Sequence, residues 1–62
     1  MKYSELERKL KKAGWLPGKP IGRHPSMYHP DTGAYIKLGH HKTEEVASGT
    51  LHEISRQTGI QF

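Results

Sequence analysis

A turn followed by a short alternating segment constrains the fold of this chain more than any other feature. Residues 34–38, AYIKL, alternate apolar and polar side chains, as a half-buried strand does. The preceding residues 30–33, PDTG, have proline and aspartate early and glycine late, which is the chemistry of a tight turn. We therefore predict that residues 26–29, SMYH, pair antiparallel with residues 34–38 in a central hairpin.

A candidate helix lies on each side of this hairpin. Each begins with a hydroxyl residue followed three positions later by glutamate, the spacing of a capping box, and each ends at a glycine that can adopt the left-handed conformation. Apolar residues recur at helical spacing in both segments. The residues are Ser4, Glu7 and Gly14 in the first segment, and Thr50, Glu53 and Gly59 in the second.

The segment between the first helix and the hairpin predicts a third, less regular strand near residues 15–21. Pro17 and Pro20 each remove a backbone donor, which confines this strand to a sheet edge or an irregular path. The order helix, three strands, helix predicts an α+β fold, with both helices on one face of a small antiparallel sheet. With 62 residues, we expect one domain over residues 1–62 and a small core.

Charge and composition limit the functions that this chain can have. Ten Lys and Arg residues against six Asp and Glu give a net charge of +4, which favours an anionic partner, although a solvated basic surface is the simpler alternative. The chain has no cysteine, so disulfides and thiolate metal sites are excluded. It has no signal-peptide pattern and no stretch near the roughly 18 apolar residues of a membrane span. We expect a cytoplasmic protein without a membrane partner.

Side-chain alternation predicts a surface site. If residues 24–29 are extended, His24, Ser26 and Tyr28 share one face of the strand, and that face is the open one. Lys37 then lies on or near the same surface. An imidazole, an aromatic ring and a cation on one surface suit binding of RNA.

Several short motifs also occur along the chain in a particular order. They are LKKAGW at residues 10–15, Gly-x-His at residues 22–24, HPDTG at residues 29–33, HH at residues 40–41, and GTLHEI through TGI from residue 49 to residue 60. In order and spacing these motifs resemble the HicA toxins, small mRNA interferases of bacterial and archaeal toxin–antitoxin pairs. The resemblance spans nearly the whole chain.

The resemblance implies a fold like a double-stranded-RNA-binding domain and the function of a type II toxin, an endoribonuclease neutralised by a HicB-type antitoxin. It implies that His24, in the Gly-x-His motif, is the catalytic residue. It places the second family histidine at His41, with His40 as an extra neighbour. Family members usually have serine where this chain has Arg23, whose guanidinium could contact a phosphate instead of donating a hydroxyl hydrogen bond.

The chemistry is consistent with these residues. RNA cleavage can use the 2′-hydroxyl of RNA as nucleophile, so the protein must move protons and stabilise charge on the phosphate. Histidine exchanges protons near neutral pH, and cationic side chains hold phosphate oxygens. We predict a metal-independent endoribonuclease without a cofactor, with His24 as general acid or base. The predicted RNA-binding residues are Arg23, Tyr28, Lys37 and His41.

Two other functions stay open at this point. A catalytically silent RNA-binding module of the same fold would explain the charge but would give His24 no task. A histidine metal site is the weakest alternative, because His40 and His41 are adjacent and no His-x-x-x-His pair exists. Either of these two histidines could still assist catalysis. We take His29 and His52 to be bystanders.

Overall fold

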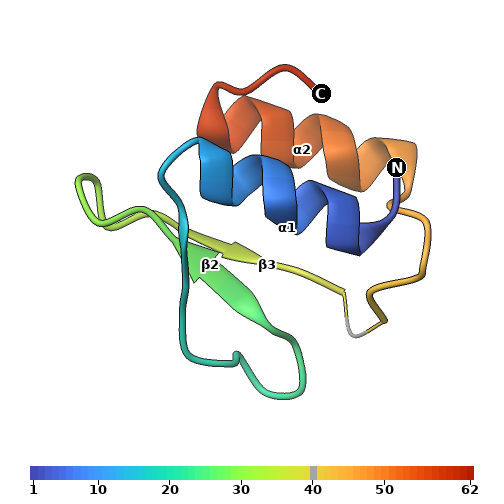
Figure 1. The fold of residues 1–62 in the computed structure, drawn as a ribbon, viewed down its shortest axis with the longest axis horizontal. Helices are drawn as coiled ribbons and strands as arrows, with labels where there is room; N and C mark the ends of the chain where they lie inside the picture. Colours follow the sequence, from blue (N-terminus) through green and yellow to red (C-terminus); the bar gives the residue numbers. More distant parts are fainter. Residues whose placement is uncertain (40) are drawn as a thin grey trace.

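The computed structural model of this protein describes residues 1–39 and 41–62. Its elements follow the predicted order, helix, three strands, helix. The α+β class is therefore confirmed, whereas the likeness to a double-stranded-RNA-binding domain stays a prediction. The elements are α1 (Tyr3–Lys12), β1 (Leu16–Pro17), β2 (Ser26–Tyr28), β3 (Tyr35–Lys37) and α2 (Ser48–Thr58). Figure 1 shows the two helices beside strands β2 and β3.

The three strands form one antiparallel sheet in the order β1-β2-β3. The predicted hairpin is confirmed, because Met27 of β2 lies opposite Ile36 of β3. In its turn, Gly33 has φ +73° and donates its backbone N–H to the carbonyl oxygen of His29 at 2.8 Å. The edge position predicted for the third strand is confirmed as well, since β1 is an outer strand in the order β1-β2-β3, and it ends at Pro17.

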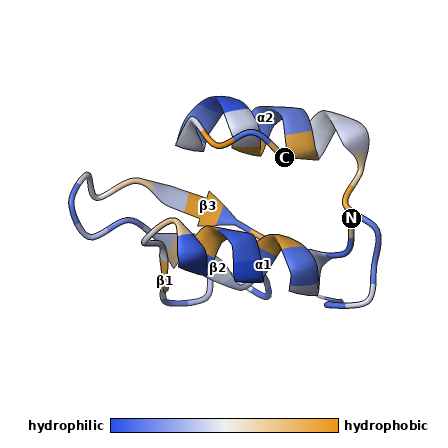
Figure 2. Cartoon of the chain, turned by 45° about the horizontal axis from the view of Figure 1, so that its top comes forward, coloured by the Kyte–Doolittle hydropathy of each residue, from blue (hydrophilic) through white to orange (hydrophobic). Residues whose placement is uncertain are grey.

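Both helices pack on the same face of the sheet. The side chains of Met27 and Ile36 share one face, because residues directly opposite each other in a sheet do so. Both are buried in one apolar cluster with Leu6 and Leu10 of α1 and Ile54 of α2. Hydrophobic segments of the two helices and of β3 accordingly turn toward the interior (Figure 2). Neither helix covers the opposite face of the sheet, which we call the open face.

The predicted capping box of α1 is wrong. The N-cap residue is Lys2, which makes no side-chain cap, and Ser4 lies inside the helix. The backbone N–H groups of Tyr3 and Ser4 instead donate to the carbonyl oxygens of Glu44 and Lys42, at 3.1 and 3.0 Å. A loop far along the chain therefore satisfies donors that a local side chain was expected to satisfy.

The predicted capping box of α2 is also wrong. This helix begins at Ser48 with Ala47 as its N-cap, two residues before Thr50. Thr50 and Glu53 therefore lie within the helix. The carboxylate of Glu53 accepts a hydrogen bond from the guanidinium of Arg56 on the helix surface, at 3.0 Å.

The predicted helix ends are confirmed. Gly14 and Gly59 have φ +98° and +75°, in the left-handed region that favours glycine. After α1, the backbone N–H groups of Trp15 and Gly14 donate to the carbonyl oxygens of Leu10 and Lys11, at 3.0 and 3.1 Å. This pair of bonds is the Schellman motif, and it directs the buried Trp15 back toward the core.

Candidate functional site

His24 stands at the base of a tight turn between β1 and β2. Ile21 and His24 exchange both backbone hydrogen bonds, at 2.8 and 3.0 Å, and Gly22 between them has φ +63°. Arg23 is consequently exposed at the tip of the turn. The Gly-x-His segment thus places a cation at the tip and an imidazole at the base.

The imidazole of His24 has a defined orientation. The ring is half-buried, and its Nδ1 lies 3.2 Å from the carbonyl oxygen of Leu38. A carbonyl oxygen only accepts, so we assign the proton of the neutral ring to Nδ1, which leaves Nε2 as the basic nitrogen. Because β2 begins at Ser26, the predicted alternation does not extend to His24, whose ring is fixed beside the end of β3.

Two of the predicted RNA-binding residues share the open face of the sheet. Tyr28 lies opposite Tyr35, and Lys37 lies opposite Ser26, so these side chains project away from the helices. The rings of Tyr28 and Tyr35 have centroids 6.0 Å apart and planes inclined by 33°. Tyr35 is 59 % exposed and was missed by the sequence analysis as a site residue. The sequence contained a signal for it, because Tyr35 and Lys37 are two residues apart in AYIKL and therefore project from the same face of the strand.

The prediction that Ser26 is exposed on this face is wrong. It was expected on the open surface but is only 4 % exposed. The backbone N–H of Gly18 donates to the carbonyl oxygen of Ser26 at 3.0 Å, and Oγ of Ser26 donates to the carbonyl oxygen of Lys19 at 2.5 Å. The segment after β1 therefore crosses over Ser26 and brings Lys19 to the margin of the open face.

The remaining predicted site residue, His41, lies in the loop after β3. It is exposed, and its carbonyl oxygen accepts the backbone N–H of Glu44 at 3.0 Å. His40, the alternative catalytic partner, lies outside the described residues. The structure therefore groups Arg23 with His24 in one turn, and Tyr28 with Lys37 on the sheet.

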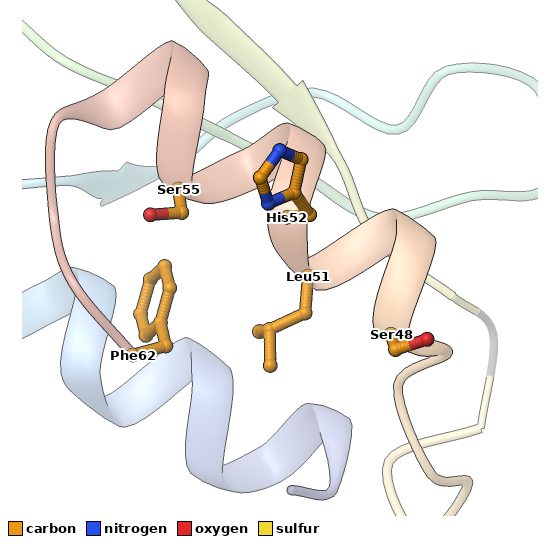
Figure 3. A pocket seen from close by; sticks show the side chains of 5 residues that line it. All are labelled: Ser48, Leu51, His52, Ser55 and Phe62. Carbon is orange, nitrogen blue, oxygen red and sulfur yellow. The ribbon is translucent and has the colours of Figure 1, made fainter.

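A separate hollow of about 240 Å³ lies between α2 and the C-terminal tail, and a histidine and two serines are among the residues that line it (Figure 3). The hydroxyl of Ser55 points away from the ring of His52 and donates to the carbonyl oxygen of Ile60 at 2.6 Å. This hydroxyl therefore holds the tail against the helix and does not form a nucleophile–base pair. The lining residues are Ser48, Leu51, His52, Ser55 and Phe62.

Residues 1–39 and 41–62 contain neither a metal-binding cluster nor a membrane-spanning helix. No three His, Cys, Asp or Glu side chains in this part of the chain come together in a way that could hold a metal ion. No helix within it has the length and apolar character needed to cross a membrane.

Comparison with known proteins identifies a family. Neither the curated proteins nor the solved structures contain a significant match to this chain. A protein-family model described as the HicA toxin of bacterial toxin–antitoxin systems matches residues 3–60, which include the turn of His24, the whole sheet and both helices. The chain therefore belongs to the HicA toxin family.

Proposed function

We propose that this protein is the toxin of a type II toxin–antitoxin pair and cleaves mRNA as a metal-independent endoribonuclease. His24 acts as the general acid or base, and a HicB-type antitoxin inhibits the reaction. Membership of the HicA toxin family supports the class of protein. The hydrogen bond between Nδ1 of His24 and the carbonyl oxygen of Leu38 is the observation that supports the catalytic role.

The proposed reaction needs no external nucleophile. The 2′-oxygen of RNA attacks the adjacent phosphorus and the bond to the 5′-oxygen breaks, which gives a 2′,3′-cyclic phosphate and a 5′-hydroxyl. The 2′-hydroxyl loses its proton to a base and the departing 5′-oxygen gains a proton from an acid, so neither oxygen is left charged and the phosphate keeps its single negative charge. Nε2 of His24 is the nitrogen suited to take the first proton, because Nδ1 is engaged with Leu38.

A cation beside His24 and polar groups on the open face support the same chemistry. Arg23 is its neighbour in the chain and lies at the exposed tip of the same turn. A guanidinium presents several donors to phosphate oxygens and stays charged throughout the reaction. Lys37 and Tyr28, on the open face of the sheet, provide further contacts for a phosphate and a base. Donors of this kind would stabilise the charge that develops on the phosphate.

The antitoxin is proposed to act by covering this surface. A toxin of a toxin–antitoxin pair has a cognate antitoxin, and a chain with a net charge of +4 favours an acidic partner surface. A partner seated over the turn of Arg23 and His24 would exclude RNA from the imidazole. A purified complex that cuts RNA as fast as the free toxin would contradict this steric form of inhibition.

Cleavage of a long unstructured RNA by the purified protein, with and without excess chelator, tests the proposal. Wild-type protein should cut in both conditions and leave 2′,3′-cyclic or 3′-phosphate ends. His24→Ala should reduce the rate by about a hundredfold to ten-thousandfold, the usual effect of losing a positioned acid or base. His52→Ala, at an exposed position on α2, should cut like wild type.

Circular dichroism and melting must first show that both variants are folded. Equal rates for His24→Ala and wild type would overturn the catalytic assignment. A wild-type protein that binds RNA without cutting it would favour a catalytically silent RNA-binding module. Activity that chelation abolishes and a divalent ion restores would exclude the metal-independent mechanism.

A further inference from the structure

We propose that the open face of the sheet binds a base of single-stranded RNA on the rings of Tyr35 and Tyr28, with Lys19 contacting the adjoining phosphate. This inference rests on the proposed function and deepens it, because it assigns the class of RNA that the toxin takes. It also adds two residues, Tyr35 and Lys19, to the binding surface. The geometry of the sheet, the shape of the surface and its charge each support it.

The geometry comes from the strand register. Leu16 of β1 lies opposite Tyr28 of β2, and Tyr28 lies opposite Tyr35 of β3, so one row of three side chains crosses the whole sheet. The row projects away from the face that both helices cover. Leu16 and Tyr35 are 44 % and 59 % exposed, which is high for large apolar or aromatic side chains. Leu16, Tyr28 and Tyr35 are neighbours in this row, and contiguous apolar and aromatic side chains on an open face are typical of a binding surface.

The shape is a shallow cleft of about 540 Å³ lined by Pro17, Gly18, Lys19, Tyr28 and Tyr35. With centroids 6.0 Å apart and planes inclined by 33°, the two rings cover each other only in part. A Cβ atom at Gly18 would lie 3.4 Å from Cδ1 of Tyr28 and 3.4 Å from Cε1 of Tyr35. The same Cβ would lie 2.9 Å from Oγ of Ser26, so glycine at this position lets the chain pass close to Ser26 and to the edges of both rings.

The charge of the cleft selects the occupant. Lys19 lines it, and the hydrogen bond from Oγ of Ser26 to the carbonyl oxygen of Lys19 fixes this residue at its margin. Lys37 projects from the same face of the sheet. None of the described residues that line the cleft is acidic. Aromatic rings beside cations, with no carboxylate among them, suit a nucleotide, whose base stacks and whose phosphate pairs with an ammonium group.

Stacking on this face distinguishes single-stranded from double-stranded RNA. In a duplex both faces of each base are occupied by neighbouring bases, so no face is available to a protein ring. A tyrosine platform can stack only on bases that have left the helical stack. The open face of the sheet is therefore expected to favour unpaired RNA.

Binding of short oligonucleotides, followed by fluorescence anisotropy, tests the inference. The RNA should carry 2′-O-methyl groups, which remove the proposed nucleophile and prevent cleavage during the measurement. Tyr35→Thr should weaken binding of the single strand about tenfold, because stacking of one base on an aromatic ring typically contributes that much or more. Threonine favours strands, so β3 should be retained. Tyr35→Phe keeps the ring and should bind like wild type.

A pair of lysine variants separates the phosphate contact from general charge. Lys19→Ala and Lys12→Ala each remove one positive charge, but Lys12 lies at the end of α1, away from the cleft. Lys19→Ala should reduce the slope of log affinity against log salt concentration by about 0.7, as expected for one phosphate contact on a single strand. Lys12→Ala should leave that slope unchanged. Tyr35→Thr should lower the affinity and should also leave the slope unchanged.

Several outcomes would overturn this inference. The first is that Tyr35→Thr binds the single strand as tightly as wild type does. The second is that Tyr35→Phe loses as much affinity as Tyr35→Thr. The third is that Tyr35→Thr loses as much affinity for duplex RNA as for the single strand. A loss of antitoxin affinity with unchanged RNA affinity would assign the face to the partner protein instead.

The cleavage reaction separates the inference from the proposed function. With natural RNA, Tyr35→Thr should raise KM and leave kcat nearly unchanged, whereas His24→Ala should lower kcat. If wild-type protein does not cut RNA, the proposed function fails, and the binding measurements still decide the role of Tyr35.

Discussion

The imidazole of His29 meets the indole of Trp15 edge to face, with ring centroids 5.3 Å apart and planes at 81°. Trp15 follows the end of α1, whereas His29 follows β2, so the contact joins the first helix to the hairpin. Nδ1 of His29 also accepts the backbone N–H of Asp31 at 3.2 Å within the hairpin turn. His29 therefore has a structural role that the sequence analysis did not assign.

His29→Ala should destabilise the protein without affecting the chemistry. It removes an aromatic contact and a turn hydrogen bond, each contributing about 1 kcal/mol, so the free energy of unfolding should fall by about 1–3 kcal/mol. Urea unfolding measures this loss. His52→Ala is the matched control and should change stability by less than about 0.5 kcal/mol. A His29→Ala protein as stable as the control would show that the ring contact contributes nothing.

Two glycine substitutions should have opposite effects on stability. Gly14 has φ +98°, and a Cβ there would lie 3.3 Å from Nε2 of His29, so Gly14→Ala should lower stability by about 1–2 kcal/mol. Gly49 lies in α2 with no atom within 4 Å of such a Cβ, so Gly49→Ala should raise stability by about 0.5 kcal/mol. Thermal melting of both variants measures the two changes, and a shift of equal sign would contradict the prediction.

The two histidines next to β2 should have opposite neutral tautomers. Nδ1 of His24 faces a carbonyl oxygen and must donate, whereas Nδ1 of His29 faces a backbone N–H and must accept. Long-range ¹⁵N–¹H correlation spectra, recorded where both rings are neutral, should therefore show protonated Nδ1 in His24 and protonated Nε2 in His29. The same tautomer in both rings would remove the argument that Nε2 of His24 is the base.

The carboxyl of Glu45 should have a lowered pKa. Its Oε2 accepts a hydrogen bond from the α-ammonium of Met1 at 2.7 Å, and this bond, the positive charge of the same group and that of Lys2 favour the ionised form. A lowered folded-state pKa adds stability above the unfolded-state pKa, and this stability is lost as the pH falls through the folded-state pKa. Because Glu45 is exposed, the effect on stability should be small.

Titration of the Glu45 side chain by NMR measures this directly. Acetylation of the α-amino group removes its charge and should return the pKa of Glu45 toward the ordinary value of a glutamate. An unchanged titration after acetylation would show that the ion pair does not form in solution.

The parts of the fold that sequence determined depend on interactions within a few residues. The turn before AYIKL, the alternation of its side chains and the glycines after both helices each act on the backbone nearby, through dihedral preference or side-chain period. These features were predicted correctly because their physical causes lie inside the predicted segment. Because side-chain alternation is local in this way, the sequence also predicted that Tyr28 and Lys37 lie on the same face of the sheet.

Only the tertiary structure decided features whose partners lie far along the chain. The first turn of α1 is capped by carbonyl oxygens of Lys42 and Glu44, so the local capping box was not needed. Ser26 is buried because the segment of Gly18 crosses it. The ring of His24 takes its orientation from Leu38, 14 residues away. A hydrogen-bond donor can pair with any suitably placed oxygen, and only the folded chain brings one particular oxygen within hydrogen-bond distance.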